Sequence, residues 1–287
     1  MTQEILSNEE INALRYDLKA YELVTNTIRV QKTRLNNMLP EADPKKDPYL
    51  GGDDTGGKGL EYLKGVCLRR LERHARKLQI WNEWLKFVPG VGPMMACKLA
   101  LHYYWRFPAV CEHCGDYLVH ENEVEGTGPL KCQGCGEKPT DLLKVKAERR
   151  DWPTVSKWWV YCGQEVRDGK LVRRRAGERC NWNTDLKNLC FHIAECIQKQ
   201  RVGHRYKDFI NERKRKRLRT HPDISAGHRN NMARAEMVKL LLSHFWHVAR
   251  HLEGLTTAGP YSEVILGHTN IIPPYYWDPA SDIEEAA

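Results

Sequence analysis

Two Cys-x-x-Cys pairs constrain this chain more than any other feature of its sequence. They read Cys111-Glu-His-Cys114-Gly and Cys132-Gln-Gly-Cys135-Gly, with 17 residues between them. Four thiolates spaced in this way can close a tetrahedron around one zinc ion, and the glycine after each second cysteine lets backbone amides turn towards sulfur. Because four cysteine ligands leave no open coordination position, we expect the zinc to be structural rather than catalytic.

Four unrelated, reduced cysteines are the main alternative to this zinc site. His113 or His120 could in principle replace one cysteine as a ligand, but with four cysteines in register neither is needed. The other six cysteines fall mostly on apolar positions of helical patterns, which favours buried thiols over a secreted disulfide framework. They are Cys67, Cys97, Cys162, Cys180, Cys190 and Cys196.

The composition is that of a folded protein without a membrane-spanning segment. Hydrophobic residues make up 41% and aromatic residues 9% of the 287 positions, which is enough for a sizeable core. The amino-terminal segment holds several acidic side chains and no apolar run, and no window reaches the 18 apolar residues of a membrane helix. We therefore expect no signal peptide and a cytoplasmic, nucleoid-associated protein.

Positive charge is concentrated in one part of the chain. The formal net charge is +8, yet residues 144–220 hold 22 Lys or Arg against 9 Asp or Glu, a local excess of +13. Lys and Arg neutralise phosphates, and the aromatic residues interleaved with them can stack on unpaired bases. A solvated helix face around a tryptophan core is the alternative. We expect the tryptophans to lie mostly in the core and the arginines to be mostly functional.

A long antiparallel helical hairpin is predicted at the amino-terminal end. Ser7 and Glu10 match a capping box, after which apolar residues recur at spacings of three and four as far as Leu39. Residues 40–58 read as a loop, and a second stripe runs over residues 60–85, so each arm should span about thirty residues, or ~45 Å. Such a hairpin presents more apolar surface than two helices can hide, which favours a homodimer or larger assembly over a closed intramolecular bundle.

The segment after the hairpin has the pattern of a helix-hairpin-helix turn. Two glycines flank one valine directly before a helix predicted over residues 93–105. Glycines in such a turn adopt conformations closed to other residues, the valine fills the gap between the helices, and the amides that open the second helix face a phosphate. A tight turn used only for packing is the alternative. The predicted nucleic-acid contacts here are Pro89, Gly90, Val91 and Gly92.

Downstream of the cysteines, β hairpins and helices are predicted in turn. Residues 117–119 and 130–131 suit a short β ribbon between the cysteine pairs, and Asp168-Gly169 favours the turn of a second hairpin, which Arg173, Arg174 and Arg175 leave together. Helices are predicted over residues 185–201 and 230–252. The basic tract between them, with a solvated and frayed helix end as the alternative to a binding surface, consists of Arg213, Lys214, Arg215, Lys216 and Arg217.

These patterns predict a mainly α protein in three parts. Residues 1–87 form the helical hairpin or coiled coil, and residues 88–253 form a helical domain that contains the helix-hairpin-helix turn. A small β zinc ribbon is inserted into that domain at residues 110–140. Residues 254–287, which are rich in proline and have no periodicity, form an irregular carboxy-terminal tail.

The order of these parts resembles that in insertion-sequence transposases of the 110/116/902 type, the bridge-RNA-guided recombinases. The similar segments cover about residues 12–252 without the zinc module: the hairpin, Val88-Pro-Gly-Val-Gly92, Trp158 to Gly163 with the basic hairpin, Gly177 to Leu189, and Met232 to Leu252. The family has a RuvC-like domain with four acidic residues, then a coiled coil and a helical transposase domain with a catalytic serine. The resemblance implies that this chain contains the coiled coil and the helical transposase domain, and that its partner is DNA.

The chain departs from the family pattern at the places where that family performs its chemistry. It has no counterpart of the RuvC-like domain, and residues 163–175 contain no serine; Asp168, a weak attacker of phosphodiesters, falls near that position. The catalytic residue is therefore unassigned. Candidate nucleophiles elsewhere are Ser156, Tyr161, Tyr206 and Ser225, with helix capping as the alternative for the last.

The function expected from the sequence is DNA binding of the transposase or recombinase type, in DNA transposition or site-specific recombination, in a catalytically degenerate form. The glycine turn would hold one phosphate strand, the three arginines at 173–175 a second, and the basic tract would add non-specific attraction. Two alternatives stay open. One is an active recombinase with a RuvC-like domain supplied in trans, and the other is a zinc-braced scaffold that binds a structured RNA.

Overall fold

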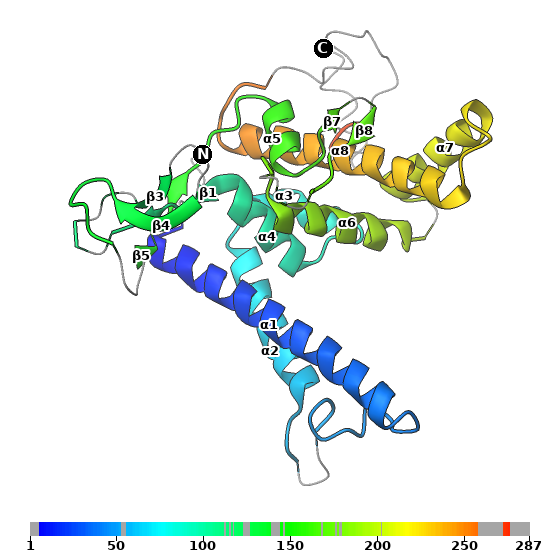
Figure 1. Ribbon diagram of the computed structural model, residues 1–287. Coiled ribbons are helices and arrows are strands. Elements are labelled where there is room, and N and C mark those ends of the chain that lie inside the picture. Colours follow the sequence, from blue (N-terminus) through cyan, green and yellow to red (C-terminus); the bar gives the residue numbers. More distant parts are fainter. Residues whose placement is uncertain are drawn as a thin grey trace. The chain divides into compact units, whose positions relative to one another are not determined.

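The fold is described from a computed structural model. Its described residues are 6–52, 56–111, 113–114, 116, 118–122, 127–138, 144–145, 147–167, 169–175, 177, 180–201, 203–257 and 272–275. Helices dominate, as the sequence predicts, and the strands are few and short (Figure 1). No helix in this part of the chain is long and apolar enough to cross a membrane.

The chain divides into two compact units. One combines Ile5–Arg70 with Ala100–Asp151, and the other combines Met1–Glu4 and Leu71–Leu99 with Trp152–Ala287. The limits at residues 70 and 99 fall inside the helices Leu60–Arg76 and Pro93–Tyr104. The two ends of each of these helices therefore belong to different units. The domain limits proposed from the sequence stay a prediction.

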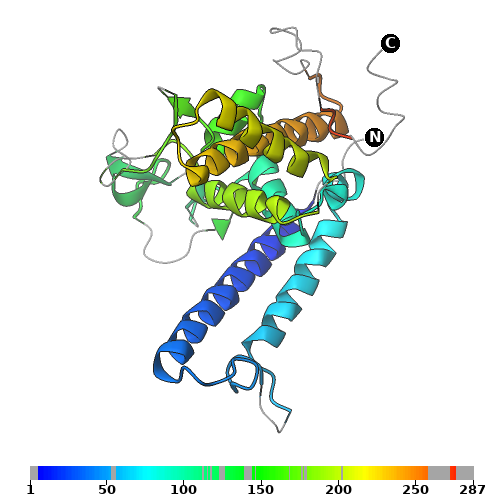
Figure 2. The same ribbon diagram turned by 90° about the vertical axis from the view of Figure 1, so that its right-hand side faces the viewer.

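Two antiparallel helices dominate the first unit. Helix α1 (Asn8–Met38) begins at the predicted capping box, in which Ser7 Oγ accepts from the Glu10 amide and the Glu10 carboxylate accepts from the Ser7 amide. Helix α2 (Leu60–Arg76) runs back beside it (Figure 2). The helices share an apolar cluster that includes Ile28, Leu35 and Cys67. Ion pairs join them near both ends of this contact, from Lys32 to Glu61 at 2.7 Å and from Arg70 to the buried Asp17 at 2.7 Å.

The second arm is shorter than the sequence pattern predicts. A continuous helix was expected over residues 60–85, but α2 ends at Arg76 and is followed by α3 (Gln79–Glu83) and the 3-10 helix η1 (Leu85–Phe87). Leu78 has an extended backbone and is buried, and the Asn82 side-chain amide donates to the Arg76 carbonyl at 2.8 Å. A side chain thus satisfies a carbonyl that would otherwise need a further helical turn.

The second unit is built around the long helix α8 (Ala226–Leu252). Its aromatic core includes Trp84, Trp158 and Phe245, with the Trp158 and Phe245 rings stacked at 5.9 Å between centroids. Helix α5 (Val155–Tyr161), which lies where a strand or helix end was expected, is tied to α8 by the bond from Trp159 Nε1 to the Lys239 carbonyl. Helices α6 (Thr184–Gln198) and α7 (Arg205–Thr220) also pack on α8.

The cysteine module is inserted through a two-stranded stalk in the first unit. Helix α4 (Pro93–Tyr104) ends at β1 (Trp105–Arg106), which pairs with β6 (Glu148–Arg149), and β2 (Ala109–Val110) pairs with β5 (Lys144–Val145). The ion pair between Arg106 and Glu148, at 2.6 Å, lies across the first of these ladders. The insertion therefore leaves and re-enters the helical part at neighbouring points.

The two predicted β hairpins are present. Between the cysteine pairs, β3 (Leu118–Asn122) lies antiparallel to β4 (Thr127–Cys132). In the second unit, β7 (Val166–Arg167) pairs with β8 (Lys170–Leu171) around a two-residue turn, in which Gly169 has φ +72°. Most of the predicted irregular tail lies outside the described residues.

Candidate metal centre and nucleic-acid interface

The four predicted cysteine ligands converge on one point. The sulfurs of Cys111, Cys114, Cys132 and Cys135 all lie within 4.8 Å of one another. Cys111 Sγ is 3.8 Å from Cys135 Sγ, and Cys114 Sγ is 3.3 Å from Cys132 Sγ. A tetrahedron with Zn–S bonds of about 2.3 Å has sulfur–sulfur edges of about 3.8 Å. The cluster therefore has the ligand set and dimensions to bind a metal ion such as zinc.

Backbone amides of both knuckles point at the sulfurs. The Asp116 amide hydrogen-bonds to the Cys114 sulfur and the Glu137 amide to that of Cys135, but burial and hydrogen bonds to the neighbouring thiols raise the pKa of both cysteines, that of Cys135 to about 12. Hydrogen bonds from the backbone amides of Cys135 and Gly134 lower the pKa of Cys132 to about 7, against the opposing effect of burial. Donors of this kind stabilise thiolates, which are the form that binds metal.

The ligands differ in exposure because one member of each pair belongs to a small core. Cys111 and Cys132 are buried together with Leu118 and are covered by Leu130, whereas Cys114 and Cys135 are exposed. Gly134 lies so close to the Asp116 side chain that a Cβ there would be 2.6 Å from a carboxylate oxygen. The second knuckle is thus packed against the first, and a side chain at 134 would require the Asp116 side chain to move.

The glycine turn before α4 has the predicted local geometry. Gly90 has φ +88°, a conformation that other residues rarely adopt, and Val91 is buried. A Cβ at Gly90 would lie 3.0 Å from backbone atoms of Cys196 and Ile197 in α6, whereas one at Gly92 would meet nothing within 4 Å. Gly90 therefore has a packing role in this fold. Phosphate contact by Pro89, Gly90, Val91 and Gly92 stays a prediction.

The three consecutive arginines after β8 are accessible. Arg173, Arg174 and Arg175 are all exposed, and they follow Val172, which is buried. The Lys187 ammonium of α6 donates to the Val172 carbonyl and fixes this strand to the helical body. The arginines thus leave a fixed backbone position towards solvent.

Lys187 and Trp182 were not among the predicted nucleic-acid contacts, and the structure brings them together near Arg173. Lys187 Nζ lies 4.8 Å from the centre of the Trp182 ring, and burial together with the nearby Arg173 charge lowers the pKa of Lys187. Gly163, with φ +67°, lets both side chains approach, because a Cβ there would be 2.8 Å from Lys187 and 3.0 Å from Trp182. Both residues fall in the segment from Gly177 to Leu189, and Trp182 is one of the aromatic residues of the basic segment, but neither signal predicts that the two side chains contact each other.

The basic tract forms a complete helical segment and is divided between two roles. Arg213 and Arg217 pair with Glu236 of α8, at 3.2 and 2.6 Å, and thereby hold α7 on α8. The interpretation of the tract as a frayed end is not supported by this geometry. Arg215 and Lys216 are exposed on α7 and Lys214 is half-buried, so these three remain the accessible part of the tract.

Most of the candidate nucleophiles have structural roles. Tyr206 is 1% exposed, and its hydroxyl lies 2.6 Å from His244 Nδ1 in the core. The Tyr161 hydroxyl accepts from Asn183 Nδ2 at 3.1 Å, and Ser225 caps α8 by accepting from the His228 amide. Ser156 is exposed on α5. Asp168, which falls near the serine position of the resembling family, lies outside the described residues.

The six other cysteines mostly confirm the expected burial. Cys67, Cys97, Cys162 and Cys190 are buried, and Cys180 and Cys196 are half-buried. The aromatic residues of the basic segment behave as predicted in part: Trp152, Trp158 and Tyr206 are buried, while Trp159 and Trp182 are half-buried.

Comparison with known proteins gives no relative for this chain. No family model, no curated protein and no solved structure matches it.

Proposed function

We propose that this protein binds nucleic acid and that its main partner is DNA. It would belong to the transposase and recombinase type of protein or be derived from it. The supporting observation is the exposed row Arg173, Arg174 and Arg175, held by the bond from Lys187 to the Val172 carbonyl. Three adjacent guanidinium groups that follow the anchored Val172 suit successive phosphates, and each such contact releases condensed counterions. The excess of +13 over residues 144–220 favours a polyanionic partner for the same segment.

The proposed cofactor is one structural zinc ion bound by the four cysteines. Four thiolates leave no position for water or substrate, so the metal would brace the ribbon between β3 and β4 rather than perform chemistry. Amides already directed at the sulfurs favour this assignment over four unrelated thiols. A cytoplasmic, nucleoid-associated location is part of the same proposal.

Catalysis is not part of the function that we favour. The buried Tyr206 hydroxyl is out of reach of a phosphodiester, and Ser225 is engaged in helix capping. A recombinase that receives its acidic domain in trans would need Ser156 or Tyr161 as its nucleophile. Trapping of a covalent protein–DNA adduct on a nicked substrate would identify that alternative.

The binding proposal is tested with the triple variant Arg173→Gln, Arg174→Gln, Arg175→Gln on labelled duplex DNA and on a folded RNA hairpin. For three lost phosphate contacts, the slope of log K against log salt should become shallower by about 2.7. The matched control Lys45→Gln, Lys46→Gln, Arg73→Gln removes the same charge from exposed positions elsewhere. An equal loss of DNA affinity in the arginine variant and the control, or no loss in the arginine variant, would contradict the assignment. Tighter binding of the RNA by the wild type would favour the scaffold alternative.

A further inference from the structure

The hairpin of the first unit carries an unusual amount of exposed apolar surface. Tyr16 is 71% exposed, Leu23 68% and Leu63 45%, and Tyr49 in the connecting loop is 67% exposed. Scattered exposed apolar residues are normal, but a contiguous row on one helix face indicates an interaction surface. The position of each residue on its helix decides which of them form such a row.

Tyr16, Leu23 and Val30 lie seven residues apart on α1 and so project from nearly the same line of the helix. Thr27 is one turn beyond Leu23 on that line, and these four residues are called the outer stripe. Residues that pack against α2 lie on a different face, which includes Val24, Ile28 and Leu35. The outer stripe is therefore a second apolar seam that α2 does not cover.

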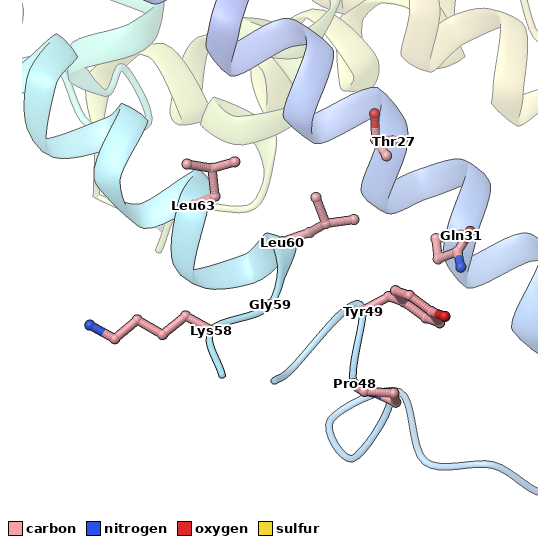
Figure 3. A pocket seen from close by; sticks show the side chains of 8 residues that line it. All are labelled: Thr27, Gln31, Pro48, Tyr49, Lys58, Gly59, Leu60 and Leu63. Atoms are coloured by element: carbon pink, nitrogen blue, oxygen red, sulfur yellow. The ribbon is translucent and has the colours of Figure 1, made fainter. Parts of the chain in front are cut away.

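A pocket opens beside the carboxy-terminal half of the outer stripe. It has a volume of about 410 Å³ and is walled by Thr27 and Gln31 from α1, Leu60 and Leu63 from α2, and Tyr49 from the loop. Figure 3 shows these side chains around the opening, with the Lys58 ammonium directed away from it. The loop wall is fixed, because Leu50 is fully buried and a Cβ at Gly59 would be 2.4 Å from the Leu50 carbonyl oxygen. Apart from Lys58, the residues that line the pocket are uncharged, and its volume is large enough for an aromatic side chain.

Charges near the outer stripe are self-complementary in one orientation only. Glu9 lies on the same face at the amino-terminal end of α1, and Arg34 lies on it at the carboxy-terminal end. Both are exposed, and neither has an ion pair within the described part of the chain. Between them the charge beside the stripe is Lys19, which is paired with Glu22 at 3.0 Å. Two parallel copies would align like charges, whereas two antiparallel copies would align Glu9 with Arg34.

We propose that a second copy of this chain docks antiparallel on the outer stripe, so that Tyr16 of each copy enters the pocket of the other. The register that pairs Glu9 with Arg34 also places Leu23 of each copy opposite Ala20 of the other, so that the two Leu23 side chains flank the two-fold axis. It brings Tyr16 opposite the segment from Thr27 to Gln31, which lines the pocket. Charge pairing, the apolar contact and the fit of knob to hole thus give one register with two-fold symmetry. This inference does not depend on the proposed nucleic-acid binding.

The test is sedimentation velocity of the full chain over a series of concentrations. The wild type should form a dimer, and Leu23→Glu should weaken it by about a hundredfold, because it places two like charges close together at the apolar centre of the interface. Leu218→Glu, which changes a leucine that is 53% exposed on α7, is the matched control and should leave the dimer intact. Thr27→Trp, which fills the pocket, should weaken the dimer by roughly tenfold.

A charge swap tests the orientation. Glu9→Arg alone and Arg34→Glu alone should each weaken the dimer, and the double variant should restore it. A parallel dimer would respond to neither single change, because one like-charged pair would replace another, and that outcome would overturn the proposal. A monomeric wild type, or a dimer that tolerates Leu23→Glu while the circular dichroism spectrum shows intact helices, would also overturn it.

Discussion

The four cysteines of the candidate metal centre differ in burial and in the backbone amides that contact their sulfurs. Cys132 belongs to the small core of the ribbon and receives two amide hydrogen bonds, whereas Cys180 is a half-buried thiol far from the cluster in sequence. Ligands at a buried position contribute to both metal affinity and folding.

We therefore expect the purified protein to contain about one zinc ion per chain. Cys132→Ser should lose the metal and the dispersion of the ribbon's amide NMR signals, while Cys180→Ser should retain both. Elemental analysis together with an amide spectrum measures this. Full metal occupancy in Cys132→Ser would contradict the four-cysteine site.

A buried histidine gives the protein a definite pH dependence. Desolvation by complete burial lowers the pKa of His244 from 6.5 to about 3, even though the Ile272 backbone acts in the opposite direction. The folded state therefore keeps His244 neutral at pH values where the unfolded chain binds a proton. Its contribution to stability is fully present above pH 6.5 and is lost as the pH falls towards 3.

Between pH 7 and pH 5 the wild type should lose about 2 kcal/mol of unfolding free energy more than His244→Gln does. Urea denaturation at the two pH values measures the difference. The contributions of the other histidines to the pH dependence cancel, because both proteins contain them. Identical pH slopes for the two proteins would mean that His244 is protonated in the folded state.

At the scale of secondary-structure elements, ion pairs position the basic helix. Helix α7 is held on α8 by Tyr206 and Ile210, which are buried, and by Glu236, which receives both Arg213 and Arg217. Partly buried pairs of this kind contribute modestly, so the apolar contacts carry most of the attachment.

Glu236→Gln should therefore lower the unfolding free energy by only about 1 kcal/mol. Glu212→Gln, at an exposed position on α7, is the matched control and should change it by less than about 0.5 kcal/mol. Denaturant unfolding followed by circular dichroism compares the two variants. An equal effect of both would show that Glu236 does not hold the helix.

Local patterns in the sequence predicted most elements, but not the points where distant side chains intervene. The capping box at Ser7, the two β hairpins and the helices on either side of the basic tract are set by neighbouring residues and were predicted correctly. The end of α2 at Arg76 depends on a hydrogen bond from Asn82, in the next helix, and the apolar spacing continues through it. Periodicity alone could not reveal that break.

The candidate sites show the same division. The four sulfurs of the two Cys-x-x-Cys pairs lie close together, and the short spacing within each pair was enough to predict this. The packing of Gly90 on α6, the role of Lys187 and the pairing of Arg213 and Arg217 with Glu236 need contacts between segments far apart in the chain. Spacing within a single segment contains no information on such contacts.

At the scale of the whole molecule, the candidate sites are distributed over the two compact units. The cysteine cluster and the outer stripe of α1 belong to the unit of Ile5–Arg70 and Ala100–Asp151. The accessible arginines and the basic helix belong to the other unit. Metal binding, self-association and nucleic-acid binding can therefore be removed separately, by Cys132→Ser, by Leu23→Glu and by the triple change at Arg173, Arg174 and Arg175.

The salt dependence of duplex DNA binding tests the central claim, nucleic-acid binding, most directly. Fluorescence anisotropy of a labelled duplex gives the dissociation constant of the wild type at salt concentrations from about 50 to 200 mM. With three phosphate contacts or more, affinity should fall by at least about 40-fold over this range. The absence of binding at the lowest salt, or an affinity that does not change with salt, would contradict the account.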